Sequence, residues 1–94
     1  MKRTAARAFV TTALLQLHDG PVPSVKDNPK AWNDAFDALH DDTGVIPDDV
    51  LALLRNIDPE RTGPVTWADA YADARVFALL FNVLGRRVDV EHGN

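Results

Sequence analysis

Residues 58–69, with the sequence DPERTGPVTWAD, have the spacing in this chain that most suggests a specific ligand. Asp58, Glu60 and Thr62 place side-chain oxygens at alternate positions, and Asp69 stands at the twelfth. Oxygen ligands in this pattern suit a hard cation such as calcium, which takes roughly six to eight of them. The candidate metal ligands are therefore Asp58, Glu60, Thr62 and Asp69.

This segment resembles a degenerate EF-hand loop with its two flanking helices. Gly63 has the place of the turn glycine, but three ligand positions depart from the pattern. The third is Glu60, the fifth is Thr62, and the twelfth is the short Asp69 where the motif has a bidentate Glu. Each change lowers the charge or reach of the ligands. The resemblance implies a weak calcium-binding module, which we keep as the alternative interpretation.

A purely structural interpretation of the same loop comes from the other two connections in the chain. Residues 19–23, 43–47 and 62–66 all read as a polar residue, Gly, and then an aliphatic residue before Pro or Thr. Glycine accommodates a turn after a helix, and Thr or Pro suits the start of the next one. The loop at 58–69 is therefore predicted to be mainly a connection between two helices, with Thr66 capping the second and Asp69 completing a capping box.

A second acidic cluster, at residues 40–49, contains one histidine and four aspartates. It could hold a divalent metal if the turn brought these side chains together. The usual role of such residues is to charge a surface and to favour helix ends. We find no catalytic motif or phosphate-binding loop in the sequence, and His18 and His92 have no partners at catalytic spacing. We therefore expect neither an enzyme nor a resident cofactor.

The elements that must position these residues are helices. Apolar residues recur at three- and four-residue spacing in four segments, which are bounded by Gly and Pro. We predict an all-α, compact bundle of four helices at about 4–18, 28–42, 47–57 and 66–84, joined by short Gly/Pro turns. The 94 residues form a single helical domain in this prediction, and residues 85–94 form an extended or frayed tail.

The last predicted helix is apolar on nearly all sides. Val76, Leu79, Leu80 and Val83 point away from the stripe that runs from Trp67 to Phe81. Such a helix is either wrapped by the other three or offers its second face to a partner. In the second case the binding residues are Leu79, Leu80, Val83, Arg86 and Arg87, with Leu15 exposed on the first helix.

Bulk composition limits the remaining classes of function. The net charge is −4 without a continuous basic footprint, which argues against nucleic-acid binding. No apolar run is long enough to cross a membrane. The absence of Cys is compatible with a cytoplasmic location, and the abundance of Arg, Ala and Asp suggests a bacterial or phage source. We therefore predict a protein–protein interaction domain: a small regulator, inhibitor or assembly component that binds another protein or forms a homo-oligomer.

Overall fold

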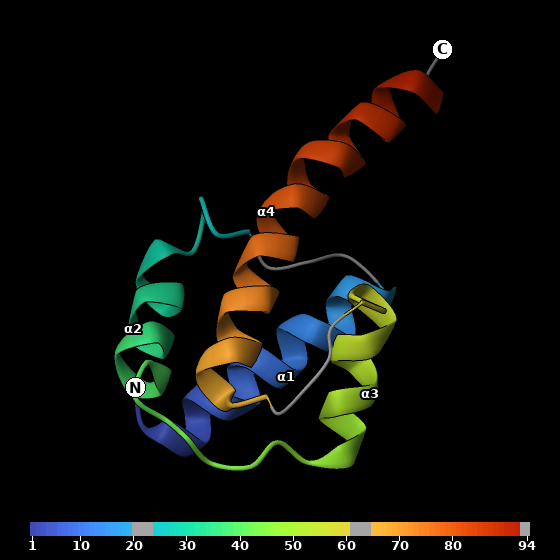
Figure 1. Ribbon diagram of the computed structural model, residues 1–94. Coiled ribbons are helices and arrows are strands. Elements are labelled where there is room, and N and C mark those ends of the chain that lie inside the picture. The colour runs from blue at the N-terminus through green and yellow to red at the C-terminus, as the bar shows by residue number, and fades with distance from the viewer. Residues whose placement is uncertain (20–23, 61–64, 93–94) are drawn as a thin grey trace.

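Four α-helices make up the fold in the computed structural model (Figure 1). It describes the backbone of residues 1–19, 24–60 and 65–92, together with their side chains except at 18, 19 and 81–92. The helices are α1 (Arg3–Asp19), α2 (Pro29–Leu39), α3 (Asp48–Ile57) and α4 (Trp67–His92). Within these residues there is no strand, only an isolated antiparallel bridge between Val45 and Thr66. The predicted all-α bundle is confirmed.

Helix α2 begins at Pro29, whose fixed φ and missing N–H suit the first helical position. Asn28 is the N-cap residue, but its side chain makes no capping hydrogen bond to the helix. Its side-chain amide instead donates to the Ser24 carbonyl oxygen at 2.9 Å, while its own carbonyl accepts the Trp32 N–H at 3.2 Å. The Asn28 side chain therefore stabilises the turn before α2 and not the start of the helix.

Helix α4 begins with the predicted capping box. The Thr66 N–H and hydroxyl both donate to Asp69 Oδ2 at 3.1 Å, and the Asp69 N–H donates back to Thr66 Oγ1 at 3.3 Å. These bonds satisfy backbone groups that a helix start otherwise leaves open. Because Thr66 also forms the bridge to Val45, the start of α4 is fixed to the connection between α2 and α3.

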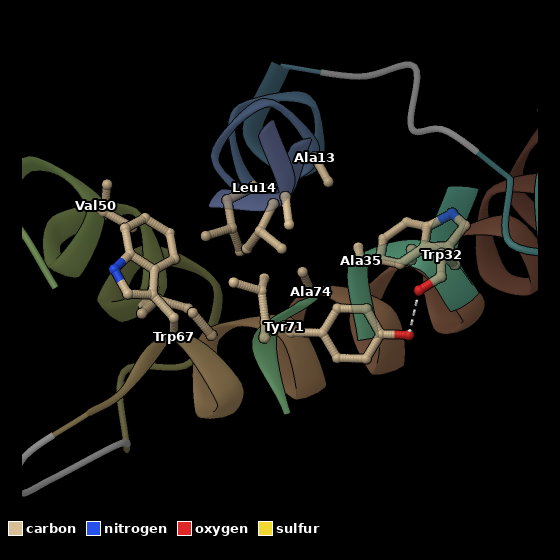
Figure 2. Packing of buried hydrophobic residues seen from close by; sticks show 14 of the residues in the cluster. Ala13, Leu14, Trp32, Ala35, Val50, Trp67, Tyr71 and Ala74 are labelled. Atoms are coloured by element: carbon tan, nitrogen blue, oxygen red, sulfur yellow. Dashed lines mark hydrogen bonds between the residues drawn. The ribbon is translucent and has the colours of Figure 1, made fainter. Parts of the chain in front are cut away.

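The core lies where α1 and α4 pack on each other and on the two shorter helices. Each of these two helices contacts all the others, whereas α2 and α3 lie on either side and do not pack together (Figure 1). Trp67 stands beside Val50 at one end of the core, and Tyr71 stands with Trp32 at the other (Figure 2). The Tyr71 hydroxyl donates to the buried Trp32 carbonyl oxygen at 2.9 Å, so α4 is tied to α2 by a polar contact as well.

Helix α4 is longer than the sequence predicts. The sequence predicts an end at residue 84 and an extended or frayed tail at 85–94, whereas the helix runs through Gly85 to His92; residues 93 and 94 lie outside the described residues. A helical Gly costs only about 1 kcal/mol relative to Ala, and no Pro follows to stop the helix. The later part of α4 projects beyond the other helices (Figure 1), and the molecule is 46 Å long in its longest dimension.

Candidate functional site: the outer face of α4

The side of α4 that faces away from the bundle carries three large aliphatic side chains. Val76 is 51% exposed, Leu79 40% and Leu80 48%. We call these three residues the outer face of α4. Of the two alternatives for this helix, complete wrapping by the other three does not hold at these residues. The part of α4 whose side chains are described has an uncovered second face.

The opposite, buried side of α4 carries a row of small residues. Ala70, Ala74 and Ala78 are fully buried and recur every four residues, so they form a narrow stripe along α4. Figure 2 shows Ala74 beneath Leu14 and Ala13 of α1. Alanine lets neighbouring helices come close, and the close packing leaves the rest of the helix circumference to solvent. The core thus holds α4 in one rotational setting and orients the outer face away from the bundle.

The other predicted binding residues lie farther along the same helix. Val83, Arg86 and Arg87 belong to the helical backbone of α4, but their side chains lie outside the described residues. Helical spacing places Val83 one turn beyond Leu79 and Leu80. Leu15, the outlying candidate on α1, is 45% exposed.

The candidate calcium ligands have varied environments. Asp69 uses one carboxylate oxygen in the capping box with Thr66. Asp58 ends α3, where its N–H donates to the Leu54 carbonyl oxygen at 2.9 Å, and Glu60 is exposed. Thr62 lies outside the described residues. Among the residues that the structure describes, no three acidic or histidine side chains gather closely enough to hold a metal ion.

Three aspartates of the acidic cluster at residues 40–49 have separate partners. Asp42 turns inward, and Arg7 of α1 donates to both of its carboxylate oxygens at 2.8 Å. Asp41 pairs with Arg3 at 3.1 Å on the surface, while Asp49 accepts the Val50 N–H at the start of α3. These side chains point in different directions, so the cluster connects helices and does not converge on one site.

The ion pair between Arg7 and Asp42 is a long-range polar contact that the sequence does not predict. Asp42 is only 2% exposed and also accepts the Gly44 N–H at 2.9 Å. The Arg7 guanidinium lies over the Trp67 ring, 5.4 Å from its centre, so the pair links α1 to α4 as well. Bidentate geometry of this kind gives strong charge-assisted hydrogen bonds. Residues 35 positions apart carry no local signal that would reveal the pair in a single sequence.

The position of Gly44 follows from this pair. A Cβ atom at residue 44 would stand 2.6 Å from Arg7 Nη2 and 3.0 Å from Asp42 Oδ1. A side chain at residue 44 would therefore require the end of the Arg7 side chain to shift away from its position beside Asp42. The sequence pattern indicates a turn at Gly44 and gives no sign of this contact.

The ion pair also sets the protonation of Asp42. The hydrogen bonds from Arg7 hold the pKa of the Asp42 carboxyl below its ordinary value of 3.8, although burial acts in the opposite direction. The Gly44 N–H and the charges of Arg7 and Arg3 lower that pKa further. Asp42 is thus a charged structural group near neutral pH, with its acceptors directed to Arg7 and Gly44.

Comparison of the chain with known protein families, with curated proteins and with solved structures found no match. None of the described helices combines the length and the apolar character needed to cross a membrane. The outer face of α4 is therefore interpreted from its own geometry.

Proposed function

We propose that this protein is a non-catalytic protein–protein interaction domain that binds through the outer face of α4. The observation that carries the proposal is the exposure of Val76, Leu79 and Leu80 on one side of one helix. Single exposed aliphatic residues are common on protein surfaces. Three adjacent ones on a helix whose opposite face is fully packed form a patch of the kind that protein partners cover.

The charges near this patch suit the edge of an interface. Arg86 and Arg87 follow the aliphatic residues in the sequence of α4. Arginine is enriched in protein interfaces because its planar head forms several hydrogen bonds and its stem packs on apolar surface. In this proposal the aliphatic residues supply the buried centre and the arginines its polar rim. A small regulator, inhibitor or assembly component of the cytoplasm would work in this way.

The test is capture of a binding protein from an extract of the source organism, using the tagged full chain, together with light-scattering mass measurement of the pure protein. The double variant Leu79→Glu/Leu80→Glu is expected to lose the captured or self-associated species and to keep its helical circular dichroism. Ala52→Glu, on an exposed position of α3, is the matched control and should bind like the wild type.

Unchanged binding by Leu79→Glu/Leu80→Glu would overturn the proposal. So would unfolding of this variant, because both residues would then be needed for the core. Binding that Ala52→Glu disrupts equally would place the partner on a different surface.

A further inference from the structure

One edge of the outer face of α4 carries an exposed arginine. Arg75 comes directly before Val76 and stands one helical turn before Leu79, and its side chain is exposed. Within the part of the chain that the structure describes, Arg75 forms no ion pair. Its guanidinium is therefore available to a carboxylate of another molecule.

The opposite edge of the outer face offers no charge to a partner. Asp73 is half-buried, one of its carboxylate oxygens is fully buried, and it interacts within its own chain. Between residues 72 and 80 the exposed positions are Ala72, Arg75, Val76, Leu79 and Leu80. The chain has a net charge of −4, yet these positions carry a single charge, and it is positive.

The spacing of the exposed residues suits a helix as the occupant. Ala72, Val76, Leu79 and Leu80 have the positions i, i+4, i+7 and i+8, which is the spacing of a stripe that one helix buries against another. The small side chain of Ala72 lets a second helix come close at that end of the stripe. In paired helices the charges that flank such a stripe select the partner, and Arg75 has a flanking position here.

We infer that the occupant of the outer face is an amphipathic helix of another protein, whose apolar stripe is flanked by Asp or Glu. This inference rests on the proposed function and names the chemistry of the partner. A flanking carboxylate of that helix pairs with Arg75, while its aliphatic residues cover Val76, Leu79 and Leu80. Apolar groups then fill the centre of the interface and charges remain at its rim, where they determine which partner binds.

The same charges argue against a second outer face of α4 as the occupant. Two outer faces packed on each other bring together only arginines and apolar residues, because neither exposes an acid between residues 72 and 80. Like charges that meet at an interface lower its affinity. An acidic helix satisfies Arg75, whereas a second outer face does not.

Two synthetic peptides test this chemistry on the full chain. Both are about 20 residues long, so that they form helices by themselves, and both have leucines at helical spacing on one side. The acidic peptide has Glu at the flanking positions, and its twin has Lys there. In a ¹⁵N NMR titration at low salt, the acidic peptide should shift the amides of Val76, Leu79 and Leu80. The lysine twin should bind about tenfold more weakly, and added salt should weaken the acidic complex.

Charge reversal at residue 75 should reduce this preference. Arg75→Glu should bind the acidic peptide about fivefold more weakly than the wild type, and the lysine twin more tightly. Arg55→Glu on α3 is the matched control, because Arg55 is also exposed and the substitution changes the net charge equally. It should leave both affinities almost unchanged. Equal affinity of the wild type for the two peptides would overturn the inference, and so would acidic binding that Arg75→Glu does not weaken.

The remaining outcomes separate this inference from the proposed function. A wild-type chain that dimerises through Val76, Leu79 and Leu80 would make a second copy the occupant and overturn the inference. If Leu79→Glu/Leu80→Glu lost a captured protein while the chain preferred neither peptide, the proposed function would stand and the acidic partner would fall. Amide shifts caused by phosphatidylglycerol vesicles, with none caused by the acidic peptide, would overturn both.

Discussion

The inner and outer faces of α4 differ in the aliphatic side chains that they carry. Between the buried rings of Trp67 and Tyr71 and beyond them, the inner face has the fully buried Ala70, Ala74 and Ala78, while Leu79 and Leu80 on the outer face are 40% and 48% exposed. Small residues permit close helix packing, so the inner face contributes to stability through density. The outer face contributes little to the fold of one chain. In the described part of this helix the larger aliphatic side chains, Val76, Leu79 and Leu80, are therefore exposed while the alanines are buried.

Shortening one leucine at each face of α4 should give the largest difference in the free energy of unfolding. Leu14 of α1 packs against the inner face of α4 and is fully buried. We expect Leu14→Ala to lower the free energy of unfolding by roughly 3 kcal/mol, because it leaves a cavity. Leu80→Ala should change it by less than about 0.5 kcal/mol.

Urea unfolding followed by circular dichroism, at protein concentrations low enough to exclude association, measures both values. Equal losses of stability in Leu14→Ala and Leu80→Ala would show that the outer face contributes as much to folding as the inner face.

A second pair of variants enlarges one buried and one exposed alanine of α4, which lie two residues apart in the sequence. Ala74 is fully buried, and Ala72 is exposed. Ala74→Leu should lower the free energy of unfolding by roughly 2 kcal/mol, because the added atoms force α1 away from the helix. Ala72→Leu should be close to neutral. Thermal unfolding of dilute protein measures the difference, and a neutral Ala74→Leu would show that the inner face is not densely packed.

The buried Asp42 carboxylate should make the stability of the protein depend on pH. The pKa of Asp42 is lowered in the folded state, so its contribution to stability is present above pH 3.8, the ordinary value, and is lost as the pH falls through the lower folded value. Asp42→Asn should therefore be less stable than the wild type near neutral pH, and the gap should narrow in acid.

Unfolding midpoints measured from pH 7 to pH 2 provide the check, with Asp41→Asn as the exposed control. A gap between Asp42→Asn and the wild type that stays constant over that range would show that the Asp42 charge does not support the fold.

The features that the sequence predicts are local ones. Helical periodicity and breakers predict four helices, and the Thr66–Asp69 capping box is readable because its partners are three residues apart. The exposed second face of α4 is also visible as periodicity, although the sequence leaves open whether other helices cover it. The projection of α4 beyond residue 84 is missed, because Gly85 is a weak stop signal when no proline follows.

The contacts that the sequence does not predict are long-range. Arg7 meets Asp42 across the bundle, and the Tyr71 hydroxyl meets the Trp32 carbonyl. Neither pair has a characteristic spacing, because tertiary packing alone brings the partners together. The role of Gly44 is hidden for the same reason: its lack of a side chain makes room for a residue of another helix.

The central claim is that the outer face of α4 is the surface through which the protein binds. Backbone amide chemical shifts of the ¹⁵N-labelled full chain, followed by NMR over a dilution series and with any captured protein added, test it most directly. The account predicts that the shift changes cluster at Val76, Leu79 and Leu80, with none on the exposed positions of α3. Changes that cluster on α3 while those three residues stay constant would contradict it.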